Sequence, residues 1–125
     1  MITEDYVSFE TAKLLKEKGF HISDISMLVG NDNHPFISGN SGYEFLLQKG
    51  QEVYPAPTLS VVMKWLREVH HLTIDVFHFR DWKVNIKTIP DDYFKADYSC
   101  PELKPTETYE QACEAAIKYC LENLI

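Results

Sequence analysis

The chain has 125 residues, of which 45% are hydrophobic and 13% aromatic, and its 19 acidic and 12 basic side chains give a formal net charge of −7. This apolar share is enough to build an ordinary core, which excludes extensive intrinsic disorder. The acidic excess argues against a nucleic-acid surface, because affinity for phosphates rests on Lys and Arg. We expect a single domain that spans residues 1–125.

Cysteine usage and hydropathy predict the cellular compartment. The three cysteines, at positions 100, 113 and 120, are odd in number and irregular in spacing, which is a poor disulfide framework. Cys113 and Cys120 lie about 10 Å apart along a predicted helix, farther than the roughly 7 Å that a disulfide allows between Cα atoms. The N-terminal residues lack the apolar stretch of a signal peptide, and no apolar run is long enough to span a bilayer. These features predict reduced thiols, no membrane association and a cytoplasmic location.

The first predicted element is a helix that starts after Ser8 and stops at Gly19. Ser8 is a favourable N-cap, and apolar residues recur behind it at helical spacing. Gly19 is predicted to adopt the left-handed conformation that ends a helix, with Phe20 folding back on the last turn.

Residues 21–53 show a weaker pattern, and we expect two or three short strands joined by turns. Residues 22–29 fit either a strand or a short helix capped by Ser23. Turn-forming residues at 31–35 and 38–42 separate the elements. Residues 43–47 and 51–54 are predicted to be strands.

A second helix is predicted from Thr58 to about His71, because its apolar residues fall at steps of three and four. These residues are Leu59, Val62, Met63, Leu66 and Val69. Trp65 lies off this stripe, which would let it pack against another segment or a second copy of the chain.

A β-hairpin is predicted over residues 72–89, since both halves alternate in polarity around Arg80-Asp81. The sequence allows two registers. A two-residue turn would place Phe77, Phe79, Trp82, Val84 and Ile86 on one face. A three-residue turn would instead group Ile74, Val76, Val84 and Ile86, because a shift of one residue exchanges the faces.

The last predicted helix covers residues 108–125 and has the clearest apolar periodicity in the chain. Thr108 and Gln111 form a capping-box pattern at its start. With the two earlier helices and the hairpin, this predicts an α+β fold in which three amphipathic helices pack on one face of a small, mainly antiparallel sheet.

Three segments of the chain resemble a family of small proteins found in gut Bacteroidales genomes and their phages or prophages. The segments are VSFETAKLLKEKGF at residues 7–20, YPAPT with MKWLREV at residues 54–58 and 63–69, and TYEQACEAAIKYCLENLI at residues 108–125. These segments make up about a third of the chain and include no catalytic motif. It implies a bacterial cytoplasmic setting and a phage origin, and it assigns no functional residue.

One candidate site is a cluster of possible metal ligands formed by His70, His71, Asp75 and His78. Imidazole and carboxylate groups are common zinc and iron ligands. The predicted geometry is unfavourable, because adjacent histidines diverge on a helix and Asp75 and His78 fall on opposite faces of a regular strand. We keep a small metal-binding protein or enzyme as an alternative hypothesis, and we assign neither a cofactor nor a metal.

Two other chemistries have less support. Cys100 lies in a predicted loop and would be nucleophilic only with a lowered pKa, for which the sequence offers no His or cationic neighbour. Cys113 and Cys120 fall on the apolar face of the last helix, which is typical of core residues. A DNA-binding regulator is a further alternative if residues 23–29 form the second helix of a helix-turn-helix, but that helix would carry no Lys or Arg.

The leading hypothesis is a non-catalytic interaction protein, in the manner of a phage-encoded accessory factor. No acid, base or nucleophile constellation stands out, so no catalytic residue is assigned, whereas clustered aromatic residues and acidic charge suit a protein interface. The predicted contact residues are Trp65, Phe77, Phe79 and Trp82. The expected partner is an unidentified protein or a second copy of the chain.

Overall fold

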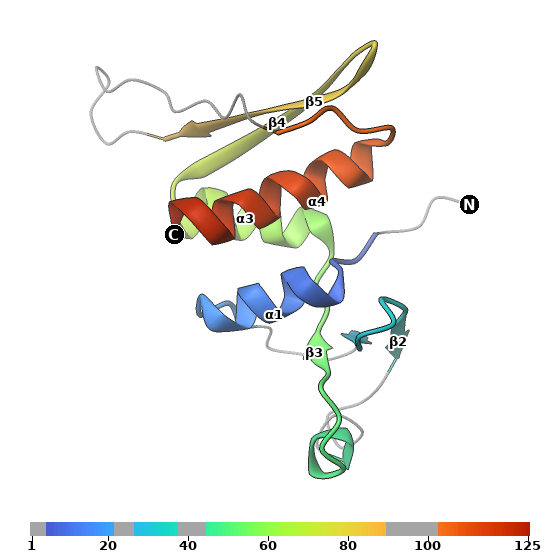
Figure 1. Cartoon of the computed structure of the whole chain (residues 1–125). Helices are drawn as coiled ribbons and strands as arrows, with labels where there is room; N and C mark the ends of the chain where they lie inside the picture. Colours follow the sequence, from blue (N-terminus) through green and yellow to red (C-terminus); the bar gives the residue numbers. More distant parts are fainter. Residues whose placement is uncertain (1–4, 22–26, 38–44, 90–102) are drawn as a thin grey trace. The chain divides into compact units, whose positions relative to one another are not determined.

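The computed structural model describes residues 5–21, 27–37, 45–89 and 103–125 (Figure 1). Its chain divides into two compact units, residues 1–58 and 59–125. Helices combined with two small antiparallel sheets make the protein α+β, as the sequence predicts. The elements are α1 (Phe9–Glu17), β1 (Met27–Val29), β2 (Pro35–Ile37), β3 (Tyr54–Pro55), α3 (Leu59–Val69), β4 (Leu72–Phe79), β5 (Asp81–Thr88), α4 (Tyr109–Tyr119) and a terminal π-helical turn (Cys120–Leu124).

Helix α1 of the first unit has the ends that its sequence predicts. The Ser8 hydroxyl accepts a hydrogen bond from the N–H of Thr11 at 3.3 Å. At the other end Gly19 has φ +88°, and the N–H of Phe20 donates to the carbonyl of Leu15 at 3.0 Å. This left-handed ending satisfies carbonyls that would otherwise lack a partner.

The first unit also contains a three-stranded sheet in the order β2-β1-β3, with both pairs antiparallel. Residues 27–29 are therefore a strand rather than part of a helix. The turn at residues 31–35 is confirmed, with Asn33 at φ +63°. Residues 22–26 and 38–42 of the predictions lie outside the described residues.

The strand predicted at residues 43–47 is wrong where the structure describes it, and the strand predicted at residues 51–54 is confirmed only at Tyr54. Residues 45–48 are helical. Gly50 adopts φ +75° and the N–H of Gln51 donates to the carbonyl of Leu46 at 3.1 Å, which repeats the ending seen at Gly19. Strand β3 is limited to Tyr54 and Pro55, because prolines cannot donate to a ladder.

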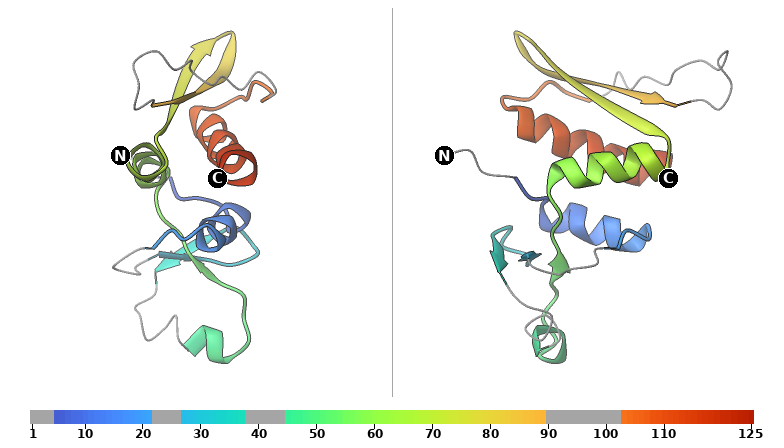
Figure 2. Two further views of the ribbon diagram at one scale, coloured as in Figure 1. Left: turned by 90° about the vertical axis from the view of Figure 1, so that its left-hand side faces the viewer. Right: turned by 180° about the vertical axis from the view of Figure 1, so that it is seen from behind.

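In the second unit, α3 and α4 lie side by side beneath the β4–β5 hairpin (Figures 1 and 2). Helix α3 packs against β4, and α4 packs against both strands. The apolar stripes of the two helices and one face of the hairpin form the core of this unit. Its buried residues are Leu59, Val62, Leu66, Leu72, Ile86, Ala112, Cys113, Ala116, Ile117, Cys120 and Leu121.

The hairpin register matches the three-residue alternative. Ile74 pairs with Ile86 and Val76 pairs with Val84, so their side chains share one face. We call this the inner face: Leu72, Ile74, Val76, His78, Trp82, Val84, Ile86 and Thr88. The outer face carries Thr73, Asp75, Phe77, Phe79, Asp81, Lys83, Asn85 and Lys87. Arg80 alone lies between the paired ends of the strands, at φ +68°.

Helix α4 begins with the predicted cap, since the Thr108 hydroxyl accepts from the N–H of Gln111 at 3.1 Å. The Gln111 side chain accepts from the N–H of Glu107 rather than that of Thr108. The expectation of three helices on one sheet face is not confirmed. Among the described residues, α3 and α4 pack against the hairpin, whereas α1 packs against β3 of the other sheet.

Candidate contact surface on the hairpin

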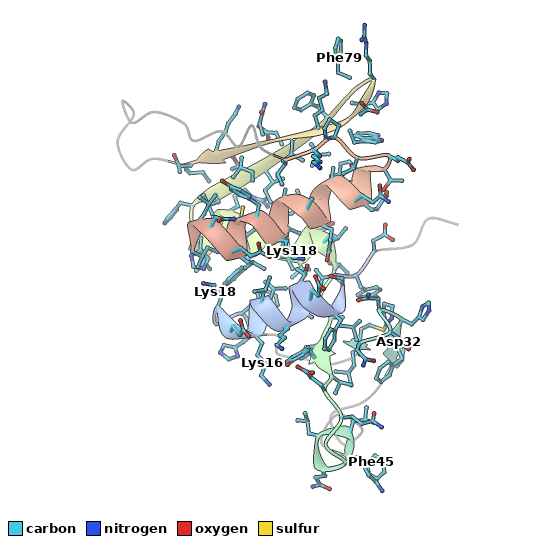
Figure 3. The ribbon with its side chains drawn as sticks, in the orientation of Figure 1. Lys16, Lys18, Asp32, Phe45, Phe79 and Lys118 are labelled. Carbon is cyan, nitrogen blue, oxygen red and sulfur yellow. The ribbon has the colours of Figure 1, made fainter. Side chains whose placement is uncertain are left out.

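Two of the predicted contact residues, Phe77 and Phe79, lie together on the outer face of the hairpin. They are two positions apart on β4, so their side chains project from the same side. Phe77 is 40% exposed and Phe79 is 63% exposed. Figure 3 shows Phe79 at the hairpin tip, away from α3 and α4. Large exposed rings on a sheet surface are typical of contact sites.

Trp82 belongs to the other face and is held by the fold of its own unit. Its ring lies edge-on to Tyr109, with 5.5 Å between ring centroids, and to His78 at 5.0 Å. Its backbone N–H and carbonyl both pair with Thr106 at 3.0 Å. The structure therefore separates Trp82 from Phe77 and Phe79, with which the two-residue register had grouped it.

Trp65, the fourth predicted contact residue, lies on α3 and is half-buried. Its ring packs edge-on against His70, with 4.6 Å between centroids. Burial, followed by the charge of His71, lowers the pKa of His70 below its ordinary value of 6.5. Trp65 thus lies on a different element from the outer face of the hairpin.

Two cationic side chains lie beside the exposed Phe79 ring. The Lys83 ammonium lies 5.2 Å from the ring centroid and the Arg80 guanidinium 5.9 Å, both within cation–π range. Lys87 is paired with Asp75 at 3.3 Å. By contrast, Arg80 and Lys83 form no ion pair with any carboxylate of the described residues. The sequence pattern does not indicate this group, because which cations lie beside the Phe79 ring depends on the hairpin register.

The four histidine and aspartate candidates do not converge. His70 and His71 lie before the start of β4, whereas His78 lies near its end, roughly 23 Å away at about 3.3 Å per residue. Asp75 points to the outer face, where it pairs with Lys87, and His78 lies on the inner face beside Trp82. Within the described ranges, no group of three or more His, Cys, Asp or Glu side chains could hold a metal ion.

Cys113 and Cys120 are fully buried, as the apolar periodicity of the last helix predicts. Burial raises the pKa of the Cys113 thiol, a hydrogen bond with Tyr109 opposes this, and Glu110 and Glu114 raise it further. A buried thiol with a raised pKa is a poor nucleophile. Cys100 lies outside the described residues.

The first unit contains an open pocket of about 420 Å³ that the sequence did not indicate. Its lining combines the β1–β2 turn with the segment before β3. The Glu52 carboxylate already has two partners. It accepts a hydrogen bond from the Tyr54 hydroxyl at 2.7 Å and forms an ion pair with Lys13 at 3.2 Å. Those two contacts lower the pKa of Glu52. The pocket is lined by Gly30, Asn31, Asp32, Phe36, Gln51, Glu52 and Val53.

Comparisons of the chain with protein-family models, with curated proteins and with solved structures found no match. No helix in the described parts of the chain combines the length and the apolar character needed to cross a bilayer.

Proposed function

We propose that the chain is a non-catalytic interaction protein that contacts a protein partner through the outer face of the β4–β5 hairpin. One observation carries the proposal: exposed Phe77 and Phe79 lie beside Arg80 and Lys83, and neither cation is paired with a carboxylate of the described residues. Aromatic rings and arginine are enriched at protein interfaces and supply much of their binding energy.

The proposal narrows the set of contact residues. Phe77 and Phe79 remain in it, and Arg80 and Lys83 join them. Trp82 is removed, because it packs against His78 and Tyr109 on the opposite face. Trp65 packs on His70, so we expect a structural role for it.

The metal and DNA hypotheses gain no support from the described residues. His70 and His71 lie before β4, whereas Asp75 and His78 lie on its opposite faces, which does not favour a shared metal site. The helix-turn-helix hypothesis required a helix through residue 29, where β1 lies instead.

The resemblance to proteins of gut Bacteroidales and their phages supports a bacterial cytoplasmic setting. We therefore place the interaction there and give the protein the role of a phage accessory factor. In this setting the partner is a host or phage protein.

The test is affinity capture of the tagged full chain from lysate of its own host, with and without phage induction, followed by mass spectrometry. We expect a stoichiometric partner that is retained by the wild type and lost by the double variant Phe77→Ala/Phe79→Ala. Phe45→Ala is the matched control, since Phe45 is also exposed and has a lysine, Lys49, 5.4 Å from its ring centroid.

Two outcomes would overturn the proposal. The first is a partner that the double variant retains as well as the wild type does. The second is the absence of any stoichiometric partner of the wild type in either condition. Circular dichroism spectra of the variant and the wild type should be the same, which shows that the variant is folded.

A further inference from the structure

One backbone edge of β4 has no hydrogen-bonding partner among the described residues. Trp82 directs its N–H and carbonyl to Thr106, away from β4, so the His78–Trp82 pair is one without ladder hydrogen bonds. The alternation of an antiparallel ladder then makes Phe77, Asp75 and Thr73 the bonded positions of β4. Consistent with this, Ile89 donates to His71 at 2.7 Å.

It follows that the backbone groups of Ile74, Val76 and His78 point away from β5. No described residue forms a backbone hydrogen bond with them. We call this row of N–H and carbonyl groups the β4 edge. Such an edge is a template for pairing with an added strand.

The other edge of the hairpin, on β5, already pairs with a residue outside the two strands. Thr106 pairs with Trp82 on β5 through two backbone hydrogen bonds of 3.0 Å each. That contact adds an extended residue to the β5 side, and the β4 edge is the matching position on the other side.

The helices beneath the hairpin leave room for such a strand. Two helices packed side by side are about 8–10 Å apart, whereas strands are about 4.8 Å apart, so a helix pair covers roughly four strands. The hairpin supplies two. Helix α3 packs against β4, so a strand added to the β4 edge would lie over α3. Two apolar residues of this helix, Val61 and Val69, are about half exposed.

The charged side chains near the β4 edge indicate which kind of strand would bind there. Asp75 and Lys87 neutralise each other, which leaves Arg80 and Lys83 against the single carboxylate of Asp81. The tip of the outer face is thus locally cationic in a chain whose net charge is −7. A carboxylate on the partner would meet two cations that form no ion pair with any carboxylate of the described residues.

We propose that the β4 edge binds an extended acidic segment of a partner protein, which adds as a further strand of the β4–β5 sheet. This inference rests on the proposed function and names the binding mode and the chemistry of the partner. Its backbone pairs with Ile74, Val76 and His78, its carboxylates lie on the outer face and meet Arg80 and Lys83 beside the phenylalanine rings, and its apolar side chains lie on the inner face over α3. Two cations are fewer than the roughly six to ten phosphate contacts of a typical nucleic-acid site, which favours a peptide.

The test is an NMR titration of the ¹⁵N-labelled full chain with a nine-residue peptide that alternates Glu and Val. We expect shift changes and slower hydrogen exchange at the amides of Ile74, Val76 and His78. A Lys/Val peptide should bind roughly three- to tenfold more weakly, because it loses two exposed ion pairs. A Glu/Val peptide N-methylated at alternate residues should cause no change at these amides.

Several results would overturn the inference. They are unchanged β4 amides at millimolar peptide, equal binding of the N-methylated peptide, and equal binding of the Lys/Val peptide. A fourth is an oligothymidylate that shifts Phe77 and Phe79 when the Glu/Val peptide does not, which would assign the surface to single-stranded nucleic acid.

A variant of the edge separates this inference from the proposed function. His78→Pro removes an N–H that points away from the hairpin, so it blocks strand addition without breaking the ladder. His78→Ala is its control, because it removes the same ring and keeps the N–H. A captured partner that is lost with Phe77→Ala/Phe79→Ala but retained by His78→Pro would leave the proposed function standing and refute strand addition.

Discussion

The side chain of Asn33 caps the helix that begins at Phe9. Its Oδ1 atom accepts a hydrogen bond from the Phe9 N–H at 2.9 Å, across 24 positions of sequence. Phe9 is the first residue of α1, so its N–H has no partner inside the helix. Together with Ser8, which accepts from Thr11, Asn33 ties the β1–β2 turn to the start of α1.

Substitutions of Asn33 separate this cap from the backbone conformation of the turn. Asn33→Gly keeps the left-handed φ and loses the acceptor, which we expect to cost about 1 kcal/mol in the free energy of unfolding. Asn33→Ala should cost about 2 kcal/mol, because alanine also disfavours that φ. Asn33→Asp keeps an acceptor and should differ little from the wild type. Urea unfolding followed by circular dichroism measures these values, and identical midpoints for Ala and Asp would refute the cap.

His71→Gly should stabilise the protein. His71 follows the end of α3 and has φ +55°, a position at which glycine is preferred because it has no Cβ. We expect a gain of about 0.5–1 kcal/mol in the free energy of unfolding. The reciprocal control is Gly19→Ala, which should lose a similar amount, since Gly19 has φ +88°. A loss of stability in His71→Gly would show that the histidine side chain has a structural role.

The two faces of the hairpin should respond differently to truncation. Trp82→Ala removes ring contacts with Tyr109 and His78 and should cost about 1–3 kcal/mol in the free energy of unfolding. Phe79→Ala removes an exposed ring and should change it by less than about 0.5 kcal/mol. Thermal unfolding of the two variants under the same conditions tests this. Equal destabilisation would mean that Phe79 is part of the fold.

Stability should fall as the pH falls through the range just below 6.5. Burial and the neighbouring His71 lower the pKa of His70 from 6.5, so the unfolded chain binds the proton more tightly than the folded chain does. The contribution of this histidine is therefore fully present above the unfolded pKa and is lost as the pH falls toward the folded pKa. Chemical unfolding at several pH values between 5.5 and 7 measures the slope. His70→Gln should reduce it, and an unchanged slope would assign it to other groups.

The thiols of Cys113 and Cys120 should resist modification in the folded protein. Both are fully buried, and burial raises the pKa of Cys113, so little thiolate is available to react. In a Cys100→Ser background, dithiobis(nitrobenzoate) should titrate two thiols in denaturant and almost none in buffer. Rapid labelling in buffer would indicate that the last helix opens readily.

Local signals in the sequence predicted much of the fold. Ser8, Gly19 and Thr108 define helix ends through contacts with residues a few positions away, so nearby sequence was sufficient. The apolar Phe45, Leu46 and Leu47 are typical of a strand, but they form a short helix that ends at Gly50 with a backbone hydrogen bond from Gln51 to Leu46. The number of sheets depends on pairing between distant segments, which periodicity does not specify.

The candidate site was only partly predictable, because the hairpin register decides it. Polarity alone allowed Trp82 to share a face with Phe77 and Phe79. The structure instead pairs Trp82 with His78, through burial beside Tyr109 and the bridge to Thr106. The Tyr109 and Thr106 contacts come from residues more than twenty positions later in the chain. The cationic surroundings of Phe79 follow from the same register.

The single residue at the hairpin tip also limits how this chain can change in length. Arg80 is alone between Phe79 and Asp81. Inserting or deleting one residue there would exchange the faces of one strand, which exposes Ile74 or Ile86 and turns phenylalanine rings or lysines toward the helices. Changes of two residues preserve the alternation. Tolerated insertions and deletions at this tip should therefore involve even numbers of residues, because side chains return to the same face of a strand every two residues.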